Sequence, residues 1–211
     1  MDFIRDRTAL APVPLVPEIE IYQATEMTEL WRATAADLAG WDDSPFWAFP
    51  WAGGQALARH VLDHPELVAG LRVADVGTGS GLVAIAAVLA GASRVVAFDV
   101  DPFCEGAVRL NALHNGVVLD FQARSPLDAD LPDVDVVLAG DVFYEKELSA
   151  RFQAWGRGLA ARGVRVLAGD PGRLYSAREG AVDRGAYLVP TTTAIEDRPV
   201  MKTWVLEILG G

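Results

Sequence analysis

One glycine-rich run constrains the fold of this chain more than any other segment. Its letters are VADVGTGSG, at residues 73–81, and it continues an apolar stretch that begins at Leu71. The pattern predicts a buried strand over residues 71–76, a sharp turn, and a helix that begins near Leu82. Glycines at alternate positions allow positive φ and remove the Cβ atoms that would hold a ligand away from the backbone. Because the first N–H groups of a helix are unpaired, the run predicts a loop that binds a nucleotide-type cofactor.

Two features of this loop indicate which cofactor it suits. The dinucleotide fingerprint requires G-x-G-x-x-G, but Gly81 comes one residue early and Leu82 occupies the last glycine position. Asp75 would repel a pyrophosphate and attract an ammonium group, and S-adenosylmethionine (SAM) carries an ammonium and no phosphate. Asp99 ends the next predicted strand, where a carboxylate can bind ribose hydroxyls. The loop therefore predicts SAM, and the simpler alternative is a tight β-turn-α corner with Asp99 in solvent.

Length and composition limit the classes of protein that the chain can form. It has 211 residues, 51% of them hydrophobic, which predicts one domain that buries about 70% of the surface of its unfolded chain. No apolar run reaches the ~20 residues that span a bilayer, and the N-terminus mixes acidic with basic residues, unlike a signal peptide. Cys104 is the one cysteine, so we expect a reducing, cytoplasmic location and no membrane partner. The net charge of −11 disfavours nucleic acid and suits a basic protein partner.

Strand and helix patterns alternate from Leu71 onward, which is typical of a parallel sheet covered by helices. The predicted strands cover residues 71–76, 94–98, 117–121, 134–139 and 164–168, and the predicted helices cover residues 55–62, 82–90, 102–115, 145–161 and 174–180. Two further strands, at 187–193 and 201–208, have no helix between them and predict an antiparallel hairpin. The fold class is therefore α/β: a Rossmann-like, seven-stranded class I methyltransferase fold with a C-terminal antiparallel hairpin.

The domain organisation follows from the same patterns. Residues 1–16 are rich in Pro and Ala and predict a flexible N-terminal arm. Residues 17–211 form a single methyltransferase domain, in which residues 17–70 are an N-terminal extension and residues 71–211 the Rossmann-like core. The extension is expected to contain a short strand over residues 18–22, a helix around residues 27–38 and then an aromatic segment.

The aromatic segment, PFWAFPWAGG at residues 45–54, is a candidate wall for the cofactor or substrate. Trp47 and Trp51 could provide a flat apolar surface for adenine or for a sulfonium. Gly53 would let the backbone pass close to that ligand. Phe46 and Phe49 are interpreted as a hydrophobic plug between the extension and the sheet.

Polar residues that follow the fourth and fifth core strands are candidates for the acceptor side of the site. Asp141 and Tyr144 lie where the methyl acceptor would arrive, because the carboxyl ends of the strands border the ligand crevice in a doubly wound sheet. The alternative is that Asp141 caps the next helix. The Gly169–Arg173 turn follows the fifth strand on the same rim. His60 and His64 have helical spacing but no third ligand, so no metal site is predicted.

The chain resembles the lysine methyltransferases that act on the β subunit of electron-transfer flavoprotein, with their bacterial relatives. The resemblance covers residues 17–208 and rests on Pro17-Glu18-Ile19, PFWAFPWAGGQAL at 45–57, the glycine loop, GDVFY at 140–144 and GDPGR at 169–173. It implies that Asp75, Gly77, Gly79, Ser80 and Gly81 hold the methionine part of SAM and that Asp99, with Val100 beside it, holds the ribose. Many SAM enzymes place an acid after the third strand to bind the adenine amine; this chain has Gln122 there, which is the adenine candidate.

The resemblance also implies a reaction. Methyl transfer to a substrate lysine would use Asp141 to orient the amine and Tyr144 to line the channel, with the flavoprotein β subunit as protein partner and no metal. The mitochondrial address of the animal members is absent, which indicates a bacterial cytoplasmic relative, and we expect a monomer. Three alternatives remain: a methyltransferase for a ribosomal protein or another substrate, a nicotinamide oxidoreductase, and a non-catalytic SAM-fold binding module.

Overall fold

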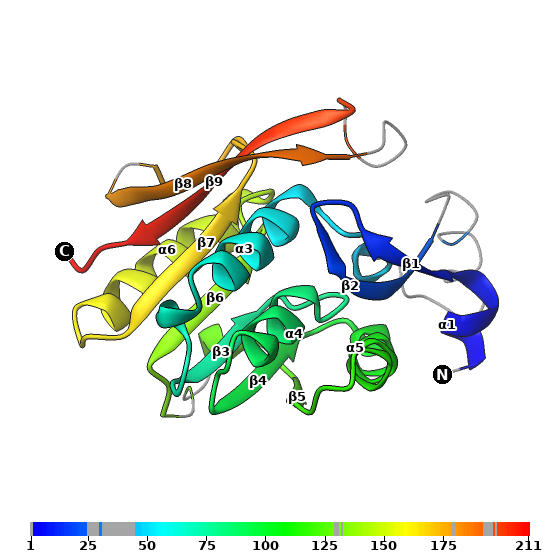
Figure 1. Cartoon of the computed structure of the whole chain (residues 1–211). Coiled ribbons are helices and arrows are strands. Elements are labelled where there is room, and N and C mark those ends of the chain that lie inside the picture. Colours follow the sequence, from blue (N-terminus) through cyan, green and yellow to red (C-terminus); the bar gives the residue numbers. More distant parts are fainter. Residues whose placement is uncertain are drawn as a thin grey trace.

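The structure is a computed structural model of the whole chain (Figure 1). It describes residues 2–24, 30, 45–128, 131, 133–178, 180–191, 196 and 198–211. Apart from Leu30, the helix predicted around residues 27–38 lies outside the described residues.

A seven-stranded sheet forms the centre of the molecule, in the order β5-β4-β3-β6-β7-β9-β8. Its strands are β3 (Arg72–Val76), β4 (Arg94–Asp99), β5 (Asp120–Ala123), β6 (Val136–Gly140), β7 (Arg165–Asp170), β8 (Ala181–Pro190) and β9 (Val200–Ile208). Strands β5, β4, β3, β6 and β7 run parallel, and β9 pairs antiparallel with both β7 and β8. In the central register Asp75 lies beside Ala97 of β4 and Leu138 of β6. The predicted seven-stranded sheet with its C-terminal hairpin is confirmed.

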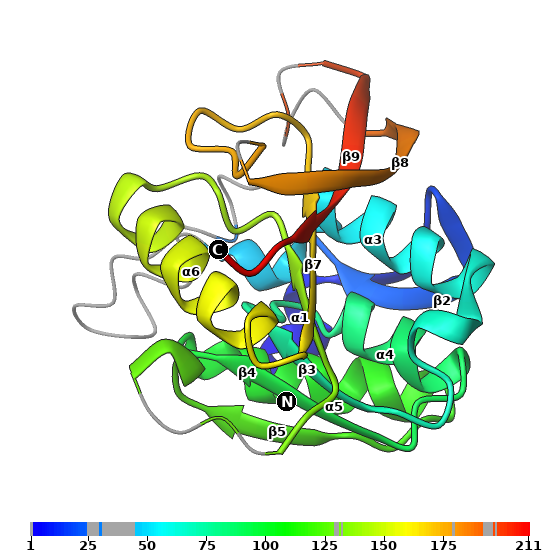
Figure 2. The same cartoon turned by 90° about the vertical axis from the view of Figure 1, so that its left-hand side faces the viewer.

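Helices cover both faces of this sheet. The helices are α3 (Ala52–Asp63), α4 (Leu82–Leu89), α5 (Pro102–His114) and α6 (Lys146–Ala160), with short 3-10 turns η1 (Phe46–Ala48), η2 (Pro65–Leu67) and η3 (Pro126–Asp128). Figure 2 shows α3 and α4 on one face and α6 on the other. Helix α4 is apolar all round, and its residues Leu82–Ala87 are buried between the sheet and the neighbouring helices. Helix α5 begins at Pro102, where the Asp101 carboxylate accepts a hydrogen bond from the Phe103 N–H.

The N-terminal segment differs from the flexible arm expected over residues 1–16. Residues Asp2–Arg7 form helix α1, and β1 (Ala9–Val13) pairs antiparallel with β2 (Val16–Gln23). Val13 is fully buried in the main hydrophobic core together with Ile19 and Ile21 of β2. The Pro- and Ala-rich composition hid this strand, because its pairing partner and its core contacts are not visible in the segment itself.

The boundaries of several elements also differ from the prediction. Helix α3 begins three residues early, at Ala52, and β5 covers residues 120–123 rather than 117–121. No helix occupies the described part of residues 174–180, where a helix was predicted. The buried Asp170 carboxylate accepts hydrogen bonds from the N–H groups of Gly172 and Arg173 and from the Ser176 hydroxyl, and the Ser176 N–H donates to the Arg173 carbonyl (3.1 Å), which fixes residues 172–176 as a turn.

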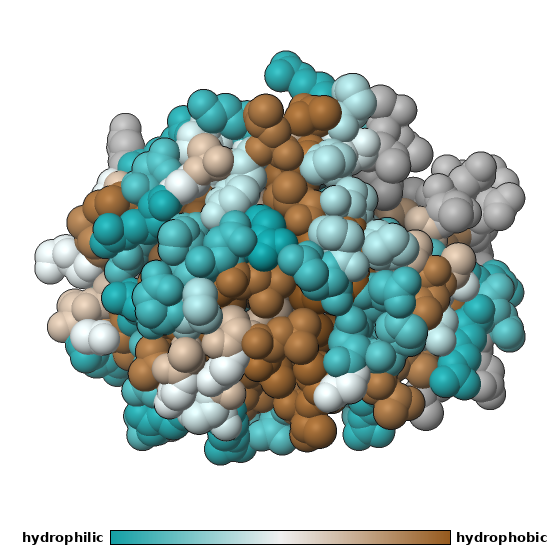
Figure 3. Space-filling view, in the orientation of Figure 1, coloured by the Kyte–Doolittle hydropathy of each residue, from teal (hydrophilic) through white to brown (hydrophobic). Residues whose placement is uncertain are grey.

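The described surface carries apolar side chains among charged ones. Figure 3 shows a band of apolar atoms down one face, flanked by polar atoms. Leu89 at the end of α4 and Leu188 in β8 are among the exposed large hydrophobic residues. Among the helices that the structure describes, none combines the length and apolarity needed to cross a membrane.

Candidate active site

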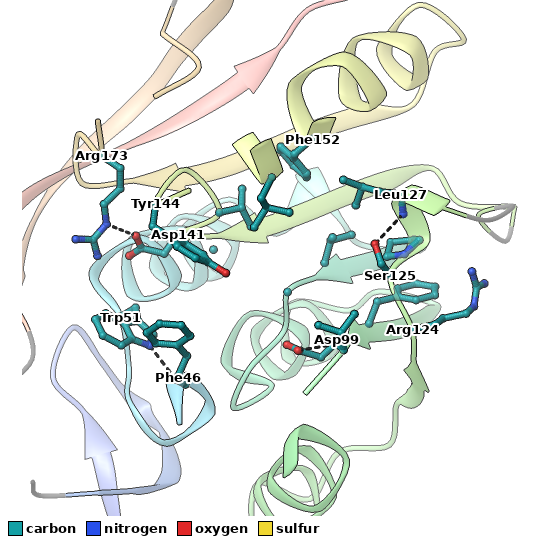
Figure 4. A pocket seen from close by; sticks show the side chains of 18 residues that line it. Phe46, Trp51, Asp99, Arg124, Ser125, Leu127, Asp141, Tyr144, Phe152 and Arg173 are labelled. Atoms are coloured by element: carbon teal, nitrogen blue, oxygen red, sulfur yellow. Dashed lines mark hydrogen bonds and ion pairs between the residues drawn. The ribbon is translucent and has the colours of Figure 1, made fainter. Parts of the chain in front are cut away.

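A cavity of about 290 Å³ opens at the carboxyl ends of the parallel strands. Val76 and Gly77 border it from β3, Asp99 from β4, and Gly140 and Asp141 from β6. The strand order reverses direction at this point, because β3 has β4 on one side and β6 on the other. Ligands of doubly wound sheets bind at such a position. Figure 4 shows the cavity with Asp99 and Arg124 on one side and Asp141, Trp51 and Arg173 on the other.

The glycine loop adopts the backbone that its sequence predicts. Gly77 and Gly79 have φ angles of 66° and 53°, in the left-handed region that disfavours other residues. Gly77 borders the cavity, and a Cβ added there would lie 3.5 Å from the Val142 side chain. Gly79 is covered differently, since its added Cβ would lie 3.6 Å from the Trp47 Cα. The loop therefore presents Gly77 to a ligand and packs Gly79 beneath η1.

Asp75 is buried behind the loop rather than on the cavity wall. One oxygen, Oδ2, accepts hydrogen bonds from the Thr78 hydroxyl (2.6 Å) and the Ala84 N–H (3.1 Å). The other, Oδ1, is buried and has no hydrogen-bond partner among the described residues. Burial raises the pKa of this carboxyl to about 7. An unpartnered buried carboxylate oxygen suits a cationic ligand group.

Asp99 borders the cavity and also shapes the loop. Its Oδ2 accepts a hydrogen bond from the Gly79 N–H (2.8 Å), and its Oδ1 accepts hydrogen bonds from the N–H groups of Val100 (2.8 Å) and Asp101 (3.1 Å). A carboxylate can accept about four hydrogen bonds, so Asp99 keeps capacity for one from a ribose hydroxyl. Val100 also borders the cavity and is 63% exposed.

The adenine candidate, Gln122, is not among the residues that line the cavity. Gln122 lies in β5 outside the cavity, and its Oε1 accepts a hydrogen bond from the Arg124 Nε (2.8 Å). The segment Arg124–Leu127, which begins two residues further on, lines the cavity. These four residues were not predicted as lining residues, because the strand was predicted to end at residue 121, two residues before its observed end. The available signal was Pro126, which begins the 3-10 turn η3 after the strand has ended.

Asp141 is held at three points at the end of β6. Its Oδ2 accepts a hydrogen bond from the Gly53 N–H (2.7 Å), its Oδ1 accepts one from Arg173 Nε (2.6 Å), and its own N–H donates to the Gly169 carbonyl (2.9 Å). Its φ of 63° is the one positive value among the described non-glycine residues. Helix α6 has Glu145 as its N-cap, so the alternative that Asp141 caps this helix is excluded.

Burial and the ion pair with Arg173 shift the pKa of Asp141 in opposite directions. Burial raises the pKa of Asp141 above its usual range, and the Arg173 guanidinium opposes that rise. Arg173 was expected in a turn on the acceptor rim, with a role in shaping the acceptor mouth left open, and the structure places it in the cavity lining. Its ion pair with Asp141 was not predicted. Arg173 follows β7 and lies far from Asp141 in the sequence, so no local sequence pattern indicates that the two side chains meet.

Gly53 serves packing rather than ligand approach. A Cβ at this position would lie 2.5 Å from the Gly169 carbonyl oxygen and 2.7 Å from the Asp141 nitrogen. The start of α3 therefore sits directly on the ends of β6 and β7. The prediction that Gly53 lies against the cofactor is not supported, because its backbone contacts Asp141.

The two candidate tryptophans separate. Trp51 borders the cavity, and its Nε1–H donates a hydrogen bond to the Phe46 carbonyl (2.8 Å). Trp47 is fully buried and stacks on Phe103 with 5.8 Å between ring centroids, so it does not form a cavity wall. Phe46, expected in the plug, borders the cavity with its ring centroid 5.6 Å from that of Tyr144. Tyr144 lies at the mouth and is 51% exposed.

The structure thus brings together part of the predicted site. The predicted residues on the cavity are Trp51, Gly77, Asp99, Val100, Asp141 and Tyr144, and those away from it are Trp47, Gly53, Asp75, Gly79, Ser80, Gly81 and Gln122. Ser80 is buried, and its carbonyl accepts a hydrogen bond from Asn111 Nδ2 (2.8 Å). Ser80 and Asn111 therefore support the glycine loop from the side away from the cavity.

Comparisons with known proteins agree with the fold. A ribosomal protein L11 methylase from Lactobacillus delbrueckii subsp. bulgaricus superposes with a TM-score of 0.51 at 22% identity, over 74% of this chain and 77% of that chain. The fold is thus a class I methyltransferase fold. Residues 57–141 match the family model described as ribosomal protein L11 methyltransferase (PrmA).

Sequence relatives are more specific. The chain is 42% identical over 173 residues to the electron transfer flavoprotein beta subunit lysine methyltransferase of Xenopus laevis, over 81% of this chain and 70% of the relative. It is 44% identical over 146 residues to the ribosomal protein L11 methyltransferase of Azotobacter vinelandii, over 65% of this chain and 46% of the relative. The chain belongs to the electron transfer flavoprotein beta subunit lysine methyltransferase family, and its fold and family identify it as a SAM-dependent methyltransferase.

Proposed function

We propose that this methyltransferase transfers methyl groups to lysine side chains of the β subunit of electron-transfer flavoprotein. The observation that carries the proposal is the two-sided cavity. Gly77 and Asp99 border it on one side, and Asp141, Trp51 and Tyr144 border it on the other. A cofactor on the first side would meet an acceptor on the second.

The residues on the first side fit SAM. The cavity wall at Gly77 has no side chain, and the left-handed backbone there admits few other residues. Asp99 offers carboxylate lone pairs toward the cavity, as ribose hydroxyls require. The unpartnered Oδ1 of Asp75 provides negative charge behind the loop for an amino-acid ammonium. Arg124–Leu127 would border the base.

The residues on the second side fit a lysine side chain. Trp51, Phe46 and Tyr144 present aromatic rings along the cavity, which suit a long unbranched alkyl chain. Asp141 lies beyond these rings with both oxygens fixed by protein donors, so it can accept a further hydrogen bond in a defined direction.

The mechanism requires alignment and loss of one proton. When bound, SAM would supply an electrophilic methyl group to the amine lone pair, with its sulfur as the leaving group. A free lysine has a pKa of about 10.4, so the amine must give its proton to solvent before transfer. Asp141 orients the amine nitrogen by hydrogen bonding, and the aromatic rings exclude water from the path. Asp141 is not assigned as the base, because a carboxylate beside an ammonium favours the protonated form.

The protein substrate is supported by the family and by charge. The Xenopus laevis relative is named for the flavoprotein β subunit. A net charge of −11 suits a lysine-rich surface, and we expect association to weaken as salt is raised. The second candidate substrate is ribosomal protein L11, which the Azotobacter vinelandii relative is named for.

Mass spectrometry tests the proposal. The enzyme and SAM are incubated with electron-transfer flavoprotein and, separately, with ribosomal protein L11. We expect mass gains of whole methyl groups on lysines of the flavoprotein β subunit, and none when Gly77→Arg protein replaces the wild type. Methylation of L11 alone would overturn the substrate, and methylation of residues other than lysine would overturn the acceptor class.

A further inference from the structure

Arg173 lies between two buried carboxylates. Its Nε donates to Asp141 Oδ1 (2.6 Å), and its two terminal nitrogens donate to the two oxygens of Glu196 (3.0 and 2.8 Å). Asp141 and Glu196 are 8% and 6% exposed. The Arg173 guanidinium also lies 6.0 Å from the centroid of the Trp51 ring, at the edge of the range for a cation–π contact. One guanidinium therefore links Asp141 and Trp51, which line the cavity, to Glu196, which does not.

The turn that carries Arg173 is itself fixed. Asp170 is fully buried, and its Oδ1 accepts hydrogen bonds from the Arg173 N–H (2.9 Å) and the Gly172 N–H (3.0 Å). The preceding residue, Gly169, accepts the Asp141 N–H through its carbonyl (2.9 Å). The turn after β7 thus holds Asp141 twice, once through backbone and once through the Arg173 side chain.

The charges at this point do not cancel. Two carboxylates face one guanidinium, and removing one partner of a buried ion pair leaves a buried charge that is costly to keep. Lysine cannot replace the arginine fully, because only the planar guanidinium can serve Asp141 and both oxygens of Glu196 together.

We propose that Arg173 is the positioning residue of the acceptor site, with Glu196 as its second anchor. Arg173 fixes the direction in which Asp141 accepts a hydrogen bond, and it offsets the negative charge that the acceptor amine meets. This inference rests on the proposed function for the identity of the acceptor, and it adds a residue that sets the amine's protonation state.

The offset has a measurable consequence for the acceptor amine. An unneutralised carboxylate beside an ammonium stabilises it, which raises the amine's pKa and lowers the fraction that can accept a methyl group. With Arg173 removed, the midpoint of the kcat–pH profile moves to higher pH. A residue with only a structural role would lower kcat without moving this midpoint.

The first experiment measures kcat from about pH 6 to about pH 10 for the wild type, Arg173→Met, Arg173→Lys and Glu196→Gln. We expect Arg173→Met to raise the midpoint by roughly one pH unit and to lower kcat at neutral pH by roughly 10- to 100-fold. Arg173→Lys is expected to recover the midpoint but only part of kcat. Arg178→Met is the matched control, since this exposed arginine stacks on Trp204, 3.7 Å from its ring centroid. An unchanged midpoint in Arg173→Met would overturn the charge role.

A second experiment needs no substrate, so it decides the inference even where the proposed substrate fails. Arg173 and Glu196 are the charged groups that face Asp141 among the described residues. Without the guanidinium, Asp141 ionises in a buried site, so the loss of thermal stability in Arg173→Met is expected to grow from about pH 5 to about pH 8. In Arg173→Met/Asp141→Asn this growth disappears. A deficit equal at both pH values would show that Arg173 does not act through the Asp141 charge.

Discussion

The two sides of the cavity are built in different ways. Most of the cofactor side comes from one continuous stretch, residues 72–100, in which β3, the glycine loop, α4 and β4 follow each other directly, and Arg124–Leu127 complete it. The acceptor side is assembled from Trp51, Asp141, Tyr144 and Arg173, which belong to segments far apart in the chain. A continuous stretch can be recognised as a motif, whereas the acceptor side depends on the Asp141 contacts with Gly53, Gly169 and Arg173.

The same two sides treat a buried acid differently. Asp75 has an unpartnered oxygen and a pKa raised to about 7 by burial, with no cation among its hydrogen-bond partners. Asp141 is also buried, but the Arg173 guanidinium opposes the rise in its pKa. The cofactor side therefore leaves negative charge available to a cationic ligand group. The acceptor side supplies its own cation, Arg173, which offsets the charge of Asp141 and so stabilises the ammonium form of the acceptor amine less.

Blocking the cofactor side gives the largest expected effect. Arginine at position 77 places a long side chain in the cavity from its wall, at a φ of 66° that is strained for any residue with a Cβ. Titration calorimetry with SAM and with its demethylated product is expected to show a loss of at least roughly 100-fold in affinity, because the ligand and the side chain claim the same volume.

The control for this variant is Gly163→Arg. Gly163 has a φ of 89°, and a Cβ there would meet nothing within 4 Å. It carries the same backbone strain without blocking the cavity, so its SAM affinity is expected to equal that of the wild type. Wild-type affinity in Gly77→Arg would place the cofactor elsewhere, and NAD binding by the wild type would end the SAM assignment.

Removing the charge of Asp141 tests whether methyl transfer can be lost while SAM binding is kept. Asp141→Asn keeps the side-chain shape, and asparagine tolerates the left-handed backbone found here. We expect kcat to fall by roughly 100-fold, the scale for loss of a positioning group, with SAM affinity changed by less than about threefold. Turnover assays and calorimetry on one preparation separate the two quantities. A matching loss of SAM affinity would mean that the two sides are not independent.

The sequence predicted the cofactor side better than the acceptor side for physical reasons. A glycine loop between a buried strand and a helix has a local signature, so the strand, the turn and the φ > 0 positions were predicted correctly. The local signature could not predict that the Asp75 side chain lies behind the loop or that Gln122 lies outside the cavity. The direction of these side chains depends on where each strand ends. Gly53 and Arg173 contact Asp141 only in the folded chain. Both lie far from Asp141 in the sequence, and no helix or strand periodicity predicts contacts over such separations.

Truncating Tyr144 tests the mouth of the acceptor side. Its ring is half exposed and packs near Phe46, with 5.6 Å between centroids. In Tyr144→Ala we expect KM for the protein substrate to rise by about tenfold, because the rim loses an aromatic contact and closes less well around the lysine. Tyr144→Phe keeps the ring and is expected to stay within about threefold of the wild type. If Phe fails as badly as Ala, the hydroxyl rather than the ring is the important group.

Neutralising Asp75 is expected to give the smallest effect, because this acid acts from behind the loop. Its pKa of about 7 predicts that SAM affinity of the wild type rises between about pH 6 and about pH 8, as the carboxylate forms and attracts the ammonium. In Asp75→Asn we expect roughly three- to fivefold weaker binding at pH 8 and a flatter pH dependence.

The same group gives a stability test whose sign follows from linkage. The folded-state pKa of Asp75 lies above its unfolded value of about 3.9, so the folded state binds the proton more tightly, and this carboxyl's contribution to stability falls as pH rises from about 4 to about 7. Thermal melts of the wild type and Asp75→Asn without cofactor measure the difference, which removes the contribution of the other acids. The asparagine variant is expected to gain stability relative to the wild type as pH rises. A difference that is constant with pH would mean that Asp75 is ionised throughout, and the contrast with the arginine-paired Asp141 would no longer hold.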